Sequence, residues 1–148
     1  MIGKPVLIDT GPLVALLNER DAAHSLCADS IRNEPLPMVT SWLVITEAAW
    51  LLRKIDQGVV RLLELITSGV IECAPLDLNA TERFIQYANK YADLKPQLAD
   101  LSLLYLAEQR DIAVVLTLDR RDFLVYRTST GKSLTLIPAV VPNDQQNK

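Results

Sequence analysis

Four acidic residues lie in the most apolar stretches of this 148-residue sequence, where carboxylates are uncommon. Asp9 and Asp119 each follow a short apolar run typical of a β-strand, and Glu47 and Asp100 lie within runs that have helical spacing of apolar residues. Burying a lone carboxylate is costly, so such a group pairs with a base, takes up a proton or binds a cation. These four acids are therefore the first candidates for a functional site.

Glu47 and Asp100 lie on helix faces that are otherwise apolar. Val44 and Leu51 flank Glu47 on its face, and Leu104 follows Asp100 by one turn, with no Lys or Arg nearby on either face. If all four acids met at one edge of a sheet, their mutual repulsion would raise their pKa values unless a cation lay between them. Oxygen ligands without His or Cys favour Mg²⁺ or Mn²⁺ over zinc.

A divalent cation held by carboxylates suits the hydrolysis of phosphodiester bonds. The cation would lower the pKa of a bound water, orient that water in line with the phosphate, and offset the charge that develops there. The hydroxyls of Thr10 and Thr117 could orient a carboxylate, a bound water or a phosphate oxygen. Arg120 and Arg121 flank the proposed site and are the best-placed contacts for phosphate. The sequence leaves open whether one or two ions act.

Each acid also has a purely structural explanation. Asp9 could cap a helix, Asp119 could belong to a polar turn, and Asp100 could be a first-turn acid favoured by the helix dipole. Glu47 is the hardest to explain in this way, because it would need an Arg partner. The joint occurrence of the four favours a functional role, whereas Asp122 more often would cap a helix or face solvent.

The apolar periodicity predicts strands that alternate with helices along the chain. Strands are expected over 6–8, 38–40, 70–74, 113–118 and 133–137, and helices from about 13 to 17 and over 22–32, 42–54, 57–67, 79–91 and 96–110. Asn79 and Glu82 match a capping box, with Phe84, Ile85 and Ala88 on one apolar face. The alternation predicts a three-layer α/β domain with a buried parallel sheet, in which sites form beyond the carboxyl ends of the strands. Asp9 and Asp119 both occupy that position.

Composition is consistent with one domain, expected over 1–141, followed by a polar and disordered tail over 142–148. No apolar run is long enough to span a membrane, and the first residues lack the apolar segment of a signal peptide, so a cytoplasmic protein is expected. Cys27 and Cys73 form no C-x-x-C pair and suit buried, reduced thiols. The net charge of −3 taken alone argues against a nucleic-acid binder, but a bound metal would neutralise part of it.

The same residues make the chain resemble the PIN domain nucleases and, within them, the VapC-type toxins of type II toxin–antitoxin modules. The resemblance rests on residues 6–11 (VLIDTG), 15–18 (ALLN), 46–47 (TE), 99–103 (ADLSL) and 116–123 (LTLDRRDF). It implies a PIN fold with a five-stranded parallel sheet, Mg²⁺- or Mn²⁺-dependent endoribonuclease activity on RNA, a homodimer, and inhibition by a separately encoded antitoxin.

The resemblance also implies roles for individual residues. Asp9, Glu47, Asp100 and Asp119 match the metal-binding acids of the family, and Thr10 and Thr117 match its hydroxyl positions. Asp122 lies near a further acid that some members have. These roles are the ones that the residues themselves suggest.

Three other functions compete with a nuclease. The Asp9-Thr10-Gly11 turn also resembles an aspartic peptidase, but helical periodicity follows it at once and no second such segment exists. A phosphatase with an aspartyl nucleophile lacks its second acid, because position 11 is Gly. A catalytically silent PIN-like domain that serves as a scaffold stays as the alternative.

Two tryptophans and the single histidine are expected to have no catalytic role. Trp42 and Trp50 are expected in the core or in a dimer interface, because their helix is apolar nearly all round. His24 is expected at the surface, with no Ser or Cys arrangement that would suggest a triad.

Overall fold

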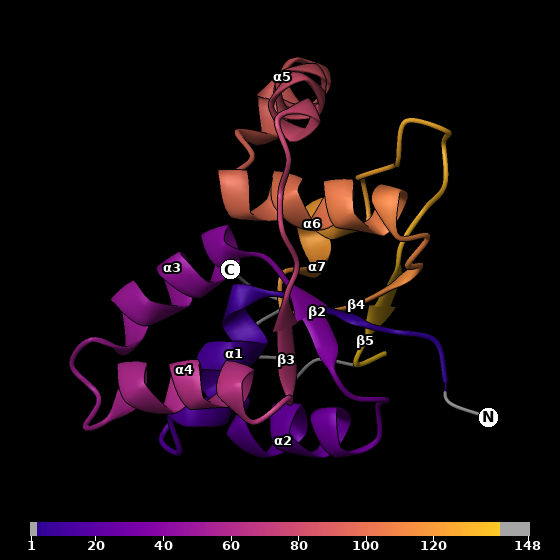
Figure 1. The fold of residues 1–148 in the computed structure, drawn as a ribbon. Coiled ribbons are helices and arrows are strands. Elements are labelled where there is room, and N and C mark those ends of the chain that lie inside the picture. Colours follow the sequence, from indigo (N-terminus) through magenta and orange to yellow (C-terminus); the bar gives the residue numbers. More distant parts are fainter. Residues whose placement is uncertain (1–2, 140–148) are drawn as a thin grey trace.

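The computed structural model describes residues 3–139 and contains a five-stranded parallel sheet in the order β3-β2-β1-β4-β5. The strands are β1 (Leu7–Ile8), β2 (Met38–Thr40), β3 (Ile71–Cys73), β4 (Val114–Leu116) and β5 (Thr135–Ile137). The helices are α1 (Thr10–Leu17), α2 (His24–Arg32), α3 (Trp42–Leu52), α4 (Gly58–Thr67), α5 (Asn79–Lys90), the 3-10 turn η1 (Ala92–Leu94), α6 (Leu98–Gln109) and α7 (Arg120–Phe123). In Figure 1, α5 and α6 lie on one side of the strands, and α2 and α4 lie on the other.

The strand order reverses direction next to β1, which lies at the centre of the sheet. The chain goes from β1 to β2 and β3 on one side, and then returns to place β4 and β5 on the other. Leu7 pairs with Val39 of β2 and with Val115 of β4. The gap between the carboxyl ends of β1 and β4 is therefore the switch point where open α/β sheets place their ligands.

Local sequence explains how the two helices beside this point begin. Asp9 leaves β1 in an extended conformation and accepts a hydrogen bond from the backbone N–H of Thr10, the first residue of α1. Ser41 leaves β2 in the same way, and its hydroxyl accepts from the N–H of Val44 in the first turn of α3. Both residues of β1 are fully buried, so the strand that leads to Asp9 is anchored in the core.

The five predicted strands and the longer helices are all present, with bounds that differ by a few residues. The strands over 113–118 and 133–137 are shorter than expected, and a four-residue helix, α7, replaces the predicted polar turn after Asp119. No helix between residues 3 and 139 is long and apolar enough to cross a membrane. The tail over 142–148 and the domain boundary at residue 141 lie outside the described residues.

The capping box predicted at the start of α5 is wrong, and its predicted apolar face is right only at Phe84, which packs against the core. Asn79 is already helical and makes no cap, whereas the Asp77 carboxylate accepts from the N–H of Ala80. Ile85 is 57% exposed, and Tyr87 is buried instead. Tyr87 faces α6 because its hydroxyl donates to Glu108 there, so a tertiary contact decides which face of α5 packs inward.

The interpretation of the tryptophans as core residues is also wrong. Trp42 is 52% exposed and Trp50 is 63% exposed, and the guanidinium of Arg53 lies 3.7 Å from the centre of the Trp50 ring. His24 is half-buried, and its Nδ1 lies 2.8 Å from the carbonyl oxygen of Ala15, so it links α2 to α1. The dimer interface stays as the open explanation for the tryptophans.

The corner between α3 and α4 depends on Gly58, and replacing this glycine is expected to destabilise the fold. A Cβ at Gly58 would lie 2.6 Å from the carbonyl oxygen of Leu52, so the backbone would have to move. We expect Gly58→Ala to lower the free energy of unfolding by about 1–3 kcal/mol in urea denaturation. Gly11→Ala is the control, because its Cβ would meet only Leu118 at 3.5 Å. Equal stability of the two variants would contradict this role.

Candidate functional site

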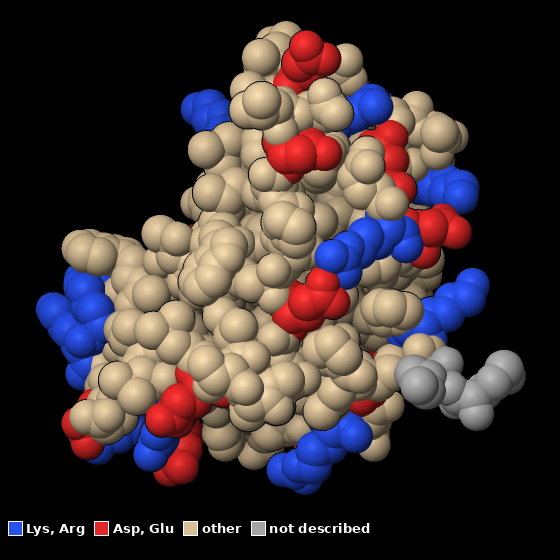
Figure 2. Space-filling view, in the orientation of Figure 1, with Lys and Arg blue, Asp and Glu red and all other residues tan. Residues whose placement is uncertain are grey.

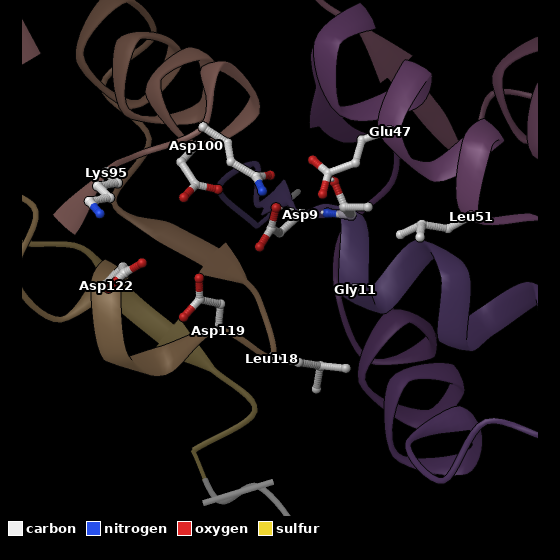
Figure 3. Close-up of a pocket in the computed structure, with 11 residues that line it drawn as sticks. Asp9, Gly11, Glu47, Leu51, Lys95, Asp100, Leu118, Asp119 and Asp122 are labelled. Atoms are coloured by element: carbon white, nitrogen blue, oxygen red, sulfur yellow. Dashed lines mark hydrogen bonds between the residues drawn. The ribbon is translucent and has the colours of Figure 1, made fainter. Parts of the chain in front are cut away.

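All four predicted acids line one hollow at the switch point of the sheet, and Asp122 joins them there (Figure 3). The hollow has a volume of about 570 Å³. Its walls are made by Asp9, Thr10, Gly11, Glu47, Leu51, Lys95, Gln97, Asp100, Leu118, Asp119 and Asp122. Five carboxylates from distant parts of the sequence thus meet in a single concave site.

Each acid comes from a different element of the fold. Asp9 follows β1 and Asp119 follows β4, so the pairing of these two strands brings them together. Glu47 comes from the middle of α3, Asp100 from the first turn of α6, and Asp122 from α7. In Figure 3, Asp9 lies between Glu47 and the group formed by the other three acids.

Asp9 is only 6% exposed and is held by hydrogen bonds at both carboxylate oxygens. The N–H of Thr10 donates to Oδ1 at 2.8 Å, and the hydroxyl of Thr117 donates to Oδ2 at 2.8 Å. Thr117 Oγ1 also accepts from the N–H of Asp119 at 3.0 Å, so Thr117 connects two of the acids. Capping of α1 therefore explains the hydrogen bond to Oδ1 of Asp9. It does not explain the hydrogen bond from Thr117 to Oδ2.

Glu47 is fixed by neutral donors. The hydroxyl of Thr10 donates to Oε2 of Glu47 at 3.3 Å. With its nitrogen turned toward Glu47, the side-chain amide of Gln97 lies 3.1 and 3.2 Å from the two carboxylate oxygens. Within residues 3–139, no Lys or Arg forms an ion pair with Glu47, so the Arg partner that would have explained this residue structurally is not found.

The tightest group of acids is Asp100, Asp119 and Asp122, which offer oxygen atoms that all lie within 4.8 Å of one another. Asp122 therefore belongs to the cluster, against the expectation that it only caps a helix or faces solvent. The hydroxyl of Tyr126 donates to Oδ2 of Asp100 at 3.3 Å. Burial and the nearby Asp100 raise the pKa of Tyr126, so its hydroxyl stays a donor.

Burial and mutual repulsion raise the pKa values of three of these acids. Burial is the largest cause that raises the pKa of Asp9 to about 6, with smaller contributions from Asp119 and Glu47. Burial, followed by the charges of Asp9 and Asp119, raises the pKa of Asp100 to about 7. Burial and the charge of Asp122 also raise the pKa of Asp119. A cation among them would remove the repulsion.

The donor set fits a small, hard cation. All the donors are carboxylate oxygens, which Mg²⁺ and Mn²⁺ prefer. Ligand oxygens on opposite sides of Mg²⁺ are about 4.2 Å apart, since each bond is about 2.1 Å long. The oxygens of Asp100, Asp119 and Asp122, within 4.8 Å of one another, need only small side-chain shifts to share an ion of this kind.

The two arginines that sequence reasoning placed beside the site do not line the hollow. The guanidinium of Arg120 donates to the carbonyl oxygen of Pro138 at 2.6 Å, so it ties α7 to the end of β5. Arg121 is exposed and close enough to Asp119 to lower the pKa of that acid slightly. Arg120 is thus fixed at the end of β5, and contact of Arg120 or Arg121 with RNA stays a prediction.

Three residues near the acids were missed by the sequence analysis. Lys95 and Gln97 line the hollow from the segment just before α6, and Tyr126 contacts Asp100 from the segment just after α7. Proximity in sequence to Asp100 could have indicated Lys95 and Gln97. Nothing local indicates Tyr126, because its contact depends on the packing of α7 against α6.

Comparison with known proteins gives matches over most of the chain. A family model described as PIN domain matches residues 6–128. Ribonuclease VapC26 of Mycobacterium tuberculosis is 29% identical over 136 residues, which cover 90% of this chain and all of that protein. Among solved structures, VapC20 of Mycobacterium tuberculosis, described as a toxin that cleaves the sarcin-ricin loop, matches with a TM-score of 0.68 and 20% identity over 74% of this chain and 86% of that one. The structural match confirms the predicted α/β fold.

Without metal, the protein is expected to lose stability as the pH rises from about 4 to 8. The pKa values of about 6 for Asp9 and about 7 for Asp100 in the folded state exceed the unfolded value of 3.8. The folded state therefore binds more protons in this window, and the stability gained from these protons is lost as the pH rises through 6 and 7. We expect a fall on the order of 3 kcal/mol between pH 5 and 8.

Urea denaturation in EDTA at the two pH values measures this fall. Asp100→Asn should reduce it, because the amide does not ionise, whereas Asp93→Asn on the exposed turn η1 should leave it unchanged. A stability that increases between pH 5 and 8 would contradict the assignment.

Proposed function

The chain belongs to the PIN domain family, and we propose that it is a metal-dependent endoribonuclease that hydrolyses RNA with a water activated at the carboxylate cluster. The observation that carries this proposal is the convergence of five acids in one hollow, which among residues 3–139 contains a single basic side chain, Lys95. The similarity to proteins described as a ribonuclease and as a toxin that cleaves an RNA loop supports RNA as the substrate.

The proposed roles follow from the contacts of each residue. Asp9, Glu47, Asp100 and Asp119 are the proposed catalytic residues and hold Mg²⁺ or Mn²⁺, and Asp122 supports them. When bound, the metal supplies Lewis-acid stabilisation of the phosphate and a water with a lowered pKa.

The hydroxyls of Thr10 and Thr117 support this cluster by fixing its acids. Thr117 holds Asp9 and the backbone of Asp119 close together, because its hydroxyl donates to the Asp9 carboxylate and accepts from the Asp119 N–H. Thr10 reaches Glu47 at 3.3 Å, so it links α1 to α3. Carboxylates held in this way need little reorganisation when the metal binds.

The charge of the hollow supports a second proposed role for the metal, besides the chemical step. Five carboxylates around a volume of about 570 Å³ repel a phosphodiester. A divalent ion reverses that repulsion locally, so substrate binding and metal binding are coupled. Contact between Arg121 and RNA beside the site remains part of the proposal.

A catalytically silent scaffold is not favoured. A scaffold has no use for several carboxylates with raised pKa values, and substitution of Asp9 or Asp100 by a neutral residue would remove an unfavourable interaction. All the acids are nevertheless present, and hydrogen bonds orient Asp9, Glu47 and Asp100. Strain of this kind is usually kept where it serves function.

We further propose that the chain is the toxin of a toxin–antitoxin pair that works in the cytoplasm as a homodimer. The free Cys27 and Cys73 suit a reducing compartment. An antitoxin that covers the hollow would block RNA. The exposed apolar residues of α3 and α4 support the dimer, since side chains of this size at the surface mark sites of protein contact. They are Trp42, Trp50, Leu51, Val60 and Leu63.

Removal of a clustered acid is expected to abolish metal-dependent cleavage of RNA. Asp119→Asn and Asp100→Asn should each lower the rate by about 100-fold or more, because each removes a proposed metal ligand. The assay is cleavage of total RNA by purified protein, free of any antitoxin, with Mg²⁺, Mn²⁺ or EDTA.

The control for this assay is Asp93→Asn, which removes an exposed acid outside the hollow and should leave the rate unchanged. Folded wild type that cuts no RNA with either metal, or cutting that persists in EDTA, would refute the nuclease proposal. Full activity of Asp119→Asn would refute the assignment of the site.

Replacing the two exposed tryptophans is expected to weaken the proposed dimer. Sedimentation at micromolar concentration should give a dimer for wild type and a monomer for Trp42→Ser combined with Trp50→Ser, because apolar area would no longer be removed from water on association. Leu78→Ser is the control, since Leu78 is 91% exposed and lies on a different element. A monomeric wild type would rule out the homodimer.

A further inference from the structure

Lys95 is the one basic side chain that lines the hollow of acids in the part of the chain that the structure describes. It lies in the short segment between η1 and α6, on the same side of the cluster as Asp100 and Asp122 (Figure 3). Leu51 lies on the opposite side, and Leu118 forms a second apolar wall. The hollow is therefore asymmetric, with a cation at one side and apolar groups at the other.

The backbone at Lys95 adopts a conformation that lysine rarely takes. Its φ of 50° and ψ of 57° lie in the left-handed region, which glycine enters without strain and a residue with a Cβ does not. The turn closes with a hydrogen bond from the Lys95 N–H to Ala92 O, which a glycine could donate equally well. Nothing in this turn requires a long basic side chain.

The stability of the fold gives no reason for a lysine here either. Lys95 is exposed and forms no ion pair with any acid among residues 3–139. Its ammonium therefore lies more than 4.0 Å from every carboxylate oxygen in that range. An exposed charge at such a distance stabilises the acids only weakly. A strained residue without a structural partner is a common sign of function.

The distribution of Lys and Arg on the rest of the surface also points to Lys95 as a contact for phosphate. On the face shown in Figure 2, Lys and Arg are dispersed and do not form a continuous basic surface. Of the two predicted phosphate contacts, Arg120 donates to the carbonyl oxygen of Pro138, and neither Arg120 nor Arg121 lines the hollow. RNA carries a negative charge at every nucleotide, so a phosphate that enters the hollow beside the one at the metal would meet the acids, and Lys95 is the compensating charge among the described residues that line it.

We propose that Lys95 binds the RNA phosphate next to the scissile one and thereby holds the strand at one side of the hollow. This inference rests on the proposed nuclease function and adds a substrate-binding residue to it. The apolar wall of Leu51 and Leu118 offers no charge for a phosphate, so this contact is confined to the Lys95 side of the hollow. Lysine suits the role as a compact charge that can reach a phosphate oxygen.

The test compares Lys95→Gln, Lys95→Arg and Lys95→Gly with the control Lys132→Gln, an exposed lysine that lines a separate hollow. Binding of a labelled single-stranded RNA is measured in Ca²⁺ at 50 to 200 mM salt, and the RNA is checked for integrity afterwards. Cleavage in Mg²⁺ gives kcat and KM for the same RNA.

Lys95→Gln is expected to raise Kd and KM about tenfold and to change kcat by less than about threefold. The slope of log Kd against log salt should become shallower by about 0.7, as expected for the loss of one phosphate contact to a single strand. Lys95→Arg should stay within about threefold of wild type, and Lys132→Gln should match wild type. Lys95→Gly should bind as weakly as Lys95→Gln and yet unfold at a higher temperature, because glycine relieves the backbone strain.

Two results overturn the inference while the nuclease proposal stands. In the first, wild type binds and cuts RNA, and Lys95→Gln equals Lys132→Gln in Kd and in salt slope. In the second, Lys95→Arg is as impaired as Lys95→Gln, which would show that the side chain acts through structure and not through its charge. Folded wild type that neither binds nor cuts RNA with any metal would overturn both proposals together.

Discussion

The repulsion among carboxylates gathered at the end of a buried strand is the interaction that the rest of this structure must accommodate. Asp9 lies directly after β1, the fully buried central strand, and its neighbours in space are acids. Such a group would protonate or move into solvent if it were free to do so. The N–H of Thr10 and the hydroxyl of Thr117 hold both of its oxygens in place and partly offset the burial that raises its pKa to about 6. These hydrogen bonds therefore keep Asp9 beside the other carboxylates, which repel it.

Rigidity at this point comes from the core and from polar contacts between helices. The hydroxyls of Ser41 and Ser102 lie 2.6 Å apart in the interior, and they join the start of α3 to α6. Because α3 carries Glu47 and α6 carries Asp100, this contact helps to fix the separation of the two acids. Buried polar contacts of this kind are favourable only when both partners are satisfied, and Ser102 also donates to a backbone carbonyl. The packing of α3 against α6 therefore also determines how far apart Glu47 and Asp100 lie.

The site is electrostatically asymmetric, and this asymmetry bears on how the proposed RNA substrate would bind. The acids provide a place for a cation, and the cation provides a place for phosphate. Lys95 extends the favourable potential to one side of the cluster, whereas Leu51 closes the other side with apolar surface. In the proposed function, a protein with a net charge of −3 binds a polyanion without a broad basic surface, through the cation held by the acids and through Lys95 beside it.

The sequence by itself determined the order of strands and helices and the identity of the main acids, because both are local signals. A carboxylate such as Glu47 on an apolar helix face is informative wherever the helix lies. Only the tertiary structure decided that Asp122 joins the cluster, that Arg120 turns away to Pro138, and that Trp50 faces solvent. It also decided which face of α5 packs inward. These outcomes depend on contacts between elements far apart in the chain, and periodicity cannot encode which side of one helix meets another.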